Sequence, residues 1–257
     1  MMGSIIGDIV GSIFEFCPTK RTDFSLFNVM SKYTDDTALT VAVADALLNN
    51  LDLAATLKKY TLDYPGRGYG GRYGQWAMSE SNEPYNSFGN GSAMRVSPVG
   101  FMAKSVEESL DKAKWSAEVT HNHPEGIKGA QAVALAIFMA RTGASKGEIK
   151  TEIEQRFEYD LSRSFERIQP ICTFNETCQG SVPEAITAFL ASESYEDTIR
   201  KAIALGGDAD TQACIAGGIA EAYYKAIPAA IIQEARKRLP VEFLEIIDRF
   251  YAKYPAA

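Results

Sequence analysis

Apolar residues recur at helical spacing along most of this sequence. Residues 36–49 place on one face Leu39, Val43, Ala46 and Leu47. Apolar residues three and four positions apart indicate an amphipathic α-helix. The same spacing is found in 52–62, 106–118, 124–141, 146–158, 181–192, 195–205, 210–226 and 240–252. Alternating strand patterns are short and rarely β-branched, so the sequence predicts an all-α protein.

The chain shows no sign of being divided. No linker rich in Pro and Ser and no repeat of fixed period interrupts it, so we expect one compact domain over residues 1–257. Residues 129–141 are apolar almost all round, which predicts a central buried helix. Longer loops are expected at 17–34, 63–92 and 159–180, and the last of these is a candidate lid.

Charge and cysteine content limit the classes of protein to which this chain can belong. The formal net charge is -7 and no basic stripe is visible, so a nucleic-acid partner is not expected. The four cysteines include no C-x-x-C pair, which favours a reducing, cytoplasmic compartment. The first residues lack the basic region and the cleavage site of a signal peptide. We expect no membrane-spanning segment, because no run of about 18 apolar residues occurs.

A first acidic cluster lies at the start of a predicted helix. Residues 34–37 read T-D-D-T and are followed by an apolar helical pattern. Thr and Asp are favoured in a first helical turn because they satisfy free N–H groups and suit the helix dipole. Taken alone, this segment is explained better by helix capping than by metal binding.

A second cluster favours metal binding. Asp208, Asp210 and Thr211 also precede a predicted helix, and Gly206 and Gly207 free the backbone just before it. Two carboxylates and a hydroxyl form an oxygen-rich set that suits Mg²⁺, Mn²⁺ or Ca²⁺ better than Zn²⁺. Carboxylates from both clusters would repel each other in an apolar interior unless cations neutralised them.

Other polar residues give weaker indications of a functional site. Asp8 and Glu15 are seven positions apart, and we expect them on one face of a buried first helix rather than on a solvated one. The two histidines, His121 and His123, are too few for a three-ligand zinc site. A cysteine nucleophile paired with His121 stays open, although nothing in the sequence supports it.

Several motifs between residues 3 and 222 match one known family in order. They are G-D-I-V-G-S-I-F-E-F, Y-T-D-D-T, G-N-G-S-A-M-R, T-H-N-H-P-E-G and G-G-D-A-D-T with A-G-G-I-A-E-A. On these residues the chain resembles the ADP-ribosylglycohydrolases. The paired T-D-D-T and G-D-A-D-T motifs are the specific ones, whereas the Gly-rich pieces alone would not identify the family.

The resemblance implies an all-α, orthogonally packed domain with two Mg²⁺ ions, or Mn²⁺ in their place. The implied metal ligands are Thr34, Asp35, Asp36, Asp208, Asp210 and Thr211. The residues implied in catalysis are Glu15, Asp35 and Asp36. The loop implied to hold the diphosphate and ribose contributes Asn90, Gly91, Ser92 and Met94, with His121 lining the same cleft.

The function implied by the resemblance is hydrolysis of the bond between ADP-ribose and a modified protein side chain or small molecule, through either an N- or an O-glycosidic link. Two alternatives stay open: an ADP-ribose-binding or immunity-type module with little turnover, and a hydrolase of another phosphorylated ribosyl compound. Aromatic residues before the G-N-G-S loop either stack on adenine or pack the loop onto the domain: Tyr69, Tyr73, Trp76, Tyr85 and Phe88.

Overall fold

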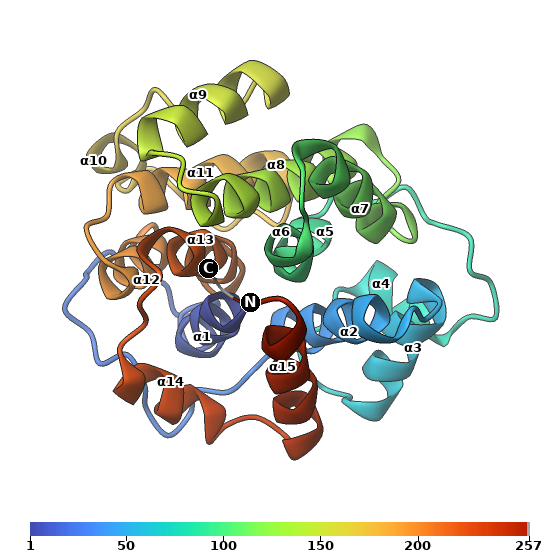
Figure 1. Ribbon diagram of the computed structural model, residues 1–257. Coiled ribbons are helices and arrows are strands. Elements are labelled where there is room, and N and C mark those ends of the chain that lie inside the picture. Colours follow the sequence, from blue (N-terminus) through green and yellow to red (C-terminus); the bar gives the residue numbers. More distant parts are fainter. Residues whose placement is uncertain (256–257) are drawn as a thin grey trace.

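The computed structural model describes residues 1–255, and most of them are helical (Figure 1). The β pairing within these residues is one isolated antiparallel bridge between Gly89 and Thr177. The all-α prediction is therefore confirmed. In chain order the helices are α1 (Met2–Gly11), α2 (Asp35–Asn49), α3 (Leu53–Asp63), α4 (Gly71–Met78), α5 (Gly91–Met94), α6 (Ser97–Met102), α7 (Val106–Glu118), α8 (Pro124–Arg141), α9 (Lys146–Phe157), α10 (Phe165–Ile168), α11 (Cys178–Leu190), α12 (Tyr195–Ala204), α13 (Ala209–Tyr224), α14 (Ala229–Arg236) and α15 (Val241–Lys253).

Every segment with strong helical spacing is a helix, and the helices missed by the sequence are short. Helix α4 lies inside the expected loop 63–92, and α10 lies inside the expected loop 159–180. Their length explains the omission, because one or two turns contain too few apolar positions to show a period. Glycine at the start of α4 also lowers its helix propensity.

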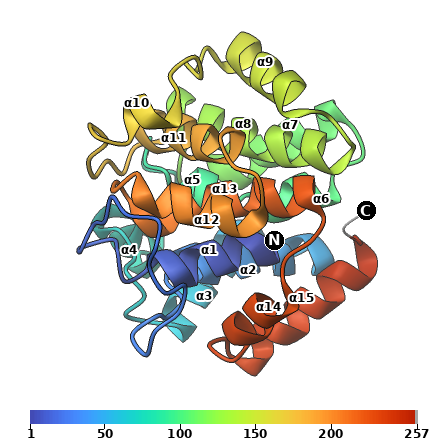
Figure 2. The same cartoon turned by 90° about the vertical axis from the view of Figure 1, so that its left-hand side faces the viewer.

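Helix α13 forms the centre of the domain. It contacts α1, α8, α11 and α12, and nearly all of its residues are buried. Figures 1 and 2 show α1 and α13 running side by side, while α2 and α8 cross them at steep angles. The apolar segment 129–141 lies in α8 and is largely buried, as its composition predicted.

Glycines allow α1 and α13 to approach closely. Gly3, Gly7 and Gly11 recur every fourth position on one face of α1. A Cβ atom on Gly7 would lie 2.1 Å from the carbonyl oxygen of Ala213, and one on Gly11 would lie 2.4 Å from the Cα atom of Asp210. The contact between the two helices is therefore made by backbone atoms, and it fixes where α13 begins.

Replacing Gly7 by alanine should separate these helices. We expect Gly7→Ala to lower the free energy of unfolding by about 3 kcal/mol, the upper end for an overpacked core. The melting temperature should then fall by roughly 6–12 °C, as measured by circular dichroism. Gly147→Ala is the matched control, because Gly147 is exposed in α9 and its added Cβ would meet nothing closer than 3.9 Å. Equal melting temperatures for the two variants would contradict the close approach.

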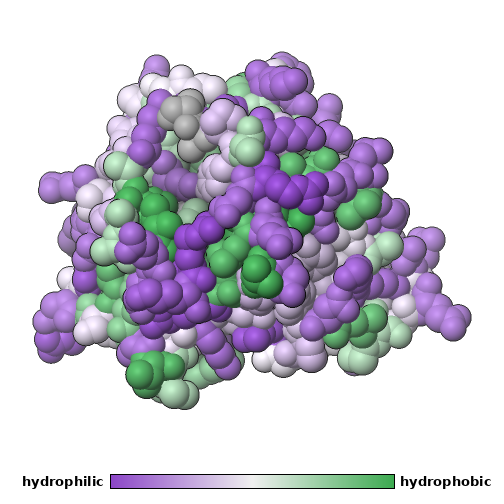
Figure 3. All heavy atoms as spheres, turned by 60° about the horizontal axis from the view of Figure 1, so that its bottom comes forward, coloured by the Kyte–Doolittle hydropathy of each residue, from purple (hydrophilic) through white to green (hydrophobic). Residues whose placement is uncertain are grey.

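The surface of the protein carries both hydrophilic and hydrophobic side chains. Figure 3 brings the face at the bottom of Figure 1 forward, and there hydrophilic side chains surround separate hydrophobic patches. Among residues 1–255, no helix combines the length and the apolar character needed to cross a membrane.

Candidate metal centre

The two acidic turns meet at the N-termini of α2 and α13. Thr34 caps α2, and its Oγ1 accepts a hydrogen bond from the backbone N–H of Asp36 at 3.3 Å. Asp208 occupies the corresponding position of α13, but its side chain makes no capping bond. The hydroxyl of Thr211 donates to Oδ2 of Asp36 at 3.4 Å, across 175 positions of sequence. The turns are therefore in direct contact, and the carboxylate of Asp208 is not used for capping.

Carboxylates gather here in two groups. Asp8, Asp36 and Asp210 each place one oxygen within 4.8 Å of the others, and so do Glu15, Asp208 and Asp210. Because Asp210 belongs to both groups, the groups are adjacent. They define two neighbouring positions at which a cation would be surrounded by oxygen atoms.

Burial and mutual repulsion raise the pKa values of these carboxyls. The pKa of Asp210 lies well above its ordinary value, because the group is buried and because Asp36 and Asp208 are close. Burial and the charge of Asp8 also raise the pKa of Asp36 well above its ordinary value. The pKa of Asp35, whose side chain is partly buried, is raised for the same two reasons. Positive charge at this place would relieve the repulsion.

The donor set suits a hard cation. Oδ1 of Asp36 is buried without a hydrogen-bond partner among residues 1–255. An unpaired buried carboxylate oxygen is costly unless a cation or a proton satisfies it. Carboxylate and hydroxyl oxygens are the ligands preferred by Mg²⁺ and Mn²⁺. The residues present therefore fit the expected pair of divalent cations.

Asp8 and Glu15 do not share a helix face, so this prediction was wrong. Helix α1 ends at Gly11, and Glu15 lies in the turn that follows. The hydroxyl of Ser12 donates to the carbonyl oxygen of Ile9 at 3.0 Å and accepts from the backbone N–H of Lys32 at 3.2 Å, which holds this turn in place. A side-chain hydroxyl that bonds to nearby backbone in this way competes with helix continuation.

Asp8 supports the start of α2. Its carboxylate accepts from the backbone N–H and the hydroxyl of Thr34, at 2.9 and 2.7 Å. It also accepts from the backbone N–H of Thr37 at 3.1 Å and from the Thr37 hydroxyl. With four donors already bound, Asp8 orients the T-D-D-T turn from behind. No local pattern around Asp8 indicates this role.

The carboxyl of Glu15 has a pKa near neutrality. Its partly buried carboxyl has a pKa raised to about 7, chiefly by burial and then by the charges of Asp208 and Asp8. A carboxyl with such a pKa exchanges protons readily near neutral pH. Glu15 faces the same cavity as Asp208 and Asp210.

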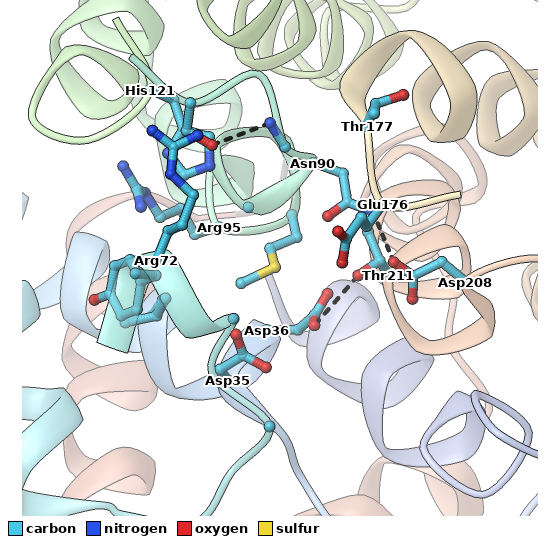
Figure 4. A pocket seen from close by; sticks show the side chains of 18 of the residues that line it. Asp35, Asp36, Arg72, Asn90, Arg95, His121, Glu176, Thr177, Asp208 and Thr211 are labelled. Carbon is cyan, nitrogen blue, oxygen red and sulfur yellow. Dashed lines mark hydrogen bonds between the residues drawn. The ribbon is translucent and has the colours of Figure 1, made fainter. Parts of the chain in front are cut away.

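This cavity encloses about 460 Å³ and has two chemically different sides. Figure 4 shows Asp36, Asp208 and Thr211 on one side and Arg72, Arg95 and His121 on the other. The acidic side is formed by the N-termini of α2 and α13. The basic side comes from α4, from the residue after α5 and from the turn before α8.

The residues expected around the substrate divide into two sets. Asn90, Gly91, Met94 and His121 line the cavity, whereas Ser92 does not. The buried hydroxyl of Ser92 donates instead to the carbonyl oxygen of Gly126 at 2.7 Å.

Asn90 and Thr34, both expected in the site, make hydrogen bonds to carboxylates. The side-chain amide of Asn90 donates to Oδ2 of Asp208 at 2.8 Å and to the hydroxyl of Ser181 at 3.0 Å. Thr34 does not line the cavity, and its hydroxyl donates to Asp8. Both side chains therefore position members of the acidic groups.

Sequence reasoning missed several residues of the site. The cavity is also lined by Arg72, Arg95, Phe174, Glu176 and Thr177. Arg95 is the last residue of the G-N-G-S-A-M-R motif, so the motif itself could have indicated it. Arg72 lies in a Gly-rich segment, and Phe174, Glu176 and Thr177 come from the expected loop 159–180, where no periodic pattern points to a site.

Lys20 was also missed, and it fixes the turn before Asp208. Its ammonium group donates to the carbonyl oxygens of Gln169 and Cys172, at 2.7 and 2.8 Å, and to that of Leu205. Gly206 follows with φ near +70°, a conformation that favours glycine. A Cβ atom on Gly206 would lie 2.9 Å from Cε of Lys20, so a larger residue here would displace the end of this side chain.

Fold and site together define an all-α protein whose cavity is lined by carboxylates from segments far apart in the sequence, among them residues 15–36 and 208–211. The family model described as ADP-ribosylglycohydrolase matches residues 1–257, and the chain belongs to this family. It is 29% identical over 304 residues to ADP-ribosylhydrolase ARH3 of Homo sapiens, covering 87% of this chain and 84% of the relative. It is 25% identical over 261 residues to ADP-ribosylarginine hydrolase Tri1 of Pseudomonas putida, covering 87% and 69%.

A solved structure shares the fold. It is described as an ADP-ribosylglycohydrolase-related protein complex, and it superposes with a TM-score of 0.76 at 23% sequence identity. The alignment covers 98% of this chain and 95% of that one. The predicted family and fold class are confirmed.

Proposed function

We propose that this chain is a hydrolase that cleaves the glycosidic bond between ADP-ribose and a modified protein side chain or small molecule, with the help of two divalent cations. The names of its relatives, an ADP-ribosylhydrolase and an ADP-ribosylarginine hydrolase, support the substrate class. The observation that carries the proposal is the set of carboxylates that line the cavity around Asp210, set opposite Arg72 and Arg95.

The acidic side would hold the cations. In this proposal the ligands come from Asp35, Asp36, Asp208, Asp210 and Thr211, with Thr34 and Asp8 supporting them from behind. Bound Mg²⁺ or Mn²⁺ supplies positive charge that orients hydroxyl groups and lowers the pKa of water. These are the properties needed to bind a ribose with vicinal hydroxyls beside a water molecule.

The protein's own carboxyls supply the rest of the chemistry. Glu15, with a pKa of about 7, accepts the proton of the attacking water and can return a proton to the leaving group. Glycosidic bonds break through a transition state with positive charge on the sugar ring. Asp35 lines the cavity and is placed to stabilise that charge.

The basic side would hold the anionic part of the substrate. Arg72 is exposed at the cavity and donates to the carbonyl oxygen of Tyr85 at 2.6 Å, which keeps its charge near the wall. Gly91 and Met94 line the same cavity. A diphosphate would gain favourable electrostatics here, and its ribose would reach the carboxylates.

A substrate panel tests the proposal. The protein should release ADP-ribose from at least one of ADP-ribosyl-arginine, ADP-ribosyl-serine and small ADP-ribosyl conjugates, as measured by liquid chromatography. EDTA should abolish this release, and Mg²⁺ or Mn²⁺ should restore it. Binding of ADP-ribose by calorimetry without turnover of any conjugate would instead identify a binding module. Turnover unchanged by EDTA would remove the cations from the proposal.

A further inference from the structure

A buried chain of polar groups leads from Arg95 to His121. Nη2 of Arg95 donates to Oγ1 of Thr120 at 2.9 Å and to the carbonyl oxygen of Ser116 at 2.6 Å. Oγ1 of Thr120 lies 2.7 Å from Nδ1 of His121. Arg95, Thr120 and His121 are all buried. Figure 4 shows Arg95 and His121 together on the basic side of the cavity.

The protons in this chain can be assigned by counting donors and acceptors. A guanidinium group only donates, so the Thr120 oxygen accepts from Arg95. The hydroxyl has one proton of its own, and within residues 1–255 its remaining partner is Nδ1 of His121. If Nδ1 carried a proton, the hydroxyl proton would be buried without an acceptor, which is unfavourable. Thr120 therefore donates to Nδ1, which must be unprotonated.

We propose that Arg95 and Thr120 are positioning residues that hold His121 as a neutral imidazole with its proton on Nε2, so that His121 donates a hydrogen bond into the cavity. The identity of the ligand that accepts this hydrogen bond depends on the proposed function, whereas the protonation state of His121 does not. Burial, followed by the charges of Arg95 and Arg72, lowers the pKa of His121 well below its ordinary value, which agrees with a neutral ring.

Nε2 of His121, the donor atom, lies on the cavity side of the ring. A Cβ atom on Gly91 would lie 3.1 Å from Nε2, and one on Gly89 would lie 3.6 Å from it. Nε2 therefore lies beside the loop that lines the cavity, and it makes no hydrogen bond to the described part of the chain. A neutral N–H donor at this place selects an acceptor, such as a phosphate or ribose oxygen of a nucleotide.

Nitrogen-15 NMR reads the protonation state directly. The two ring nitrogens of a neutral histidine have clearly separated resonances, because one is protonated and the other is not. The chain has only two histidines, His121 and His123. His123→Asn assigns the signals, since His123 caps α8 by accepting from Glu125, and asparagine can keep such a cap. We expect His121 to show a protonated Nε2 and an unprotonated, hydrogen-bonded Nδ1 from about pH 6 to about pH 8, a range that includes the ordinary pKa of histidine.

Two substitutions of Thr120 separate the hydrogen bond from simple packing. Thr120→Val keeps the shape but removes the hydroxyl, and Thr120→Ser keeps the hydroxyl. The Nδ1 resonance should move toward that of a nitrogen without a hydrogen bond in Thr120→Val and stay in place in Thr120→Ser. Circular dichroism checks that both variants are folded. A protonated Nδ1 in the parent protein, or an unmoved Nδ1 resonance in folded Thr120→Val, would overturn the assignment.

ADP-ribose serves as the ligand probe. Its binding should shift the Nε2 resonance of the parent protein, and Thr120→Val should bind it roughly 3- to 10-fold more weakly, as expected for one poorly oriented hydrogen bond. An Nε2 resonance that stays unmoved in the ADP-ribose complex would remove the donor role. Failure of the parent protein to bind ADP-ribose at all would count against the proposed function, while the tautomer would still be decided by the spectra without ligand.

Discussion

Replacing Asp210 by asparagine should lower the rate of ADP-ribose release by about 10³-fold, within the range seen when a group that stabilises transition-state charge is removed. Asp210 is the one carboxylate that belongs to both acidic groups, so the substitution removes charge from both cation positions. Asparagine keeps nearly the same shape, which limits disturbance of the buried helix start. The rate is measured with the best substrate of the panel at saturating Mg²⁺.

Two further variants sharpen this result. Asp208→Asn changes only one of the two groups, so it should leave one cation position intact, whereas Asp210→Asn should weaken both. Calorimetric titration with Mn²⁺ distinguishes these cases by stoichiometry. Asp248→Asn is the control, because Asp248 pairs with Arg236 on the surface and its loss should leave the rate unchanged. A rate for Asp210→Asn within tenfold of the parent would contradict the shared role of this carboxylate.

The melting temperature of the metal-free protein should fall as the pH is raised from about 4 through 7. Unfolded Asp and Glu have pKa values of about 4. In the folded protein burial and nearby carboxylates raise the pKa of Glu15 to about 7 and those of Asp36 and Asp210 well above the usual range. Through these three carboxyls the folded state binds more protons than the unfolded state over this window, so their contribution to stability decreases with rising pH. The lowered pKa of His121 acts in the opposite direction below its ordinary pKa, and we expect the three carboxyls to outweigh this single group.

Mg²⁺ should reverse this loss. At about 100 times its dissociation constant, a cation that binds only the folded state adds about 2.7 kcal/mol per site. With both sites filled, the melting temperature should then rise by roughly 10–20 °C at pH 8 and by less at pH 5, where protonated carboxyls bind cations poorly. Thermal melts in EDTA and in Mg²⁺ across the pH range measure both effects. A melting temperature at pH 8 that is indifferent to Mg²⁺ in the parent protein would exclude the site.

The parts of the site that the sequence could predict are those with local signatures. The turns at residues 34–37 and 208–211 combine Thr, Asp and a following helix, and the structure brings them into contact through Thr211 and Asp36. The capping role of the turn does not exclude a role in the site, because Thr34 caps α2 while Asp35 and Asp36 line the cavity.

The parts that could not be predicted depend on tertiary contacts. Apolar residues continue past Gly11, so local pattern favours a longer first helix, yet Ser12 bonds to Ile9 and Lys32 and the chain turns there. Arg72 reaches the cavity because α4 packs against α3, and nothing in a Gly-rich stretch indicates that packing. The supporting bonds of Asn90 and Asp8 span 118 and 26 positions of sequence and are equally invisible to local patterns.

The direct contact between Asp36 and Thr211 also has a consequence during synthesis. A ribosome adds residues from the N-terminus onward, so the carboxylates of α1 and α2 emerge long before their partners on α13. Until residue 211 has left the exit tunnel, the nascent polypeptide lacks Asp210 from both acidic groups and Asp208 from one of them. The growing chain should therefore capture no cation pair and act on no substrate before its folding is almost finished.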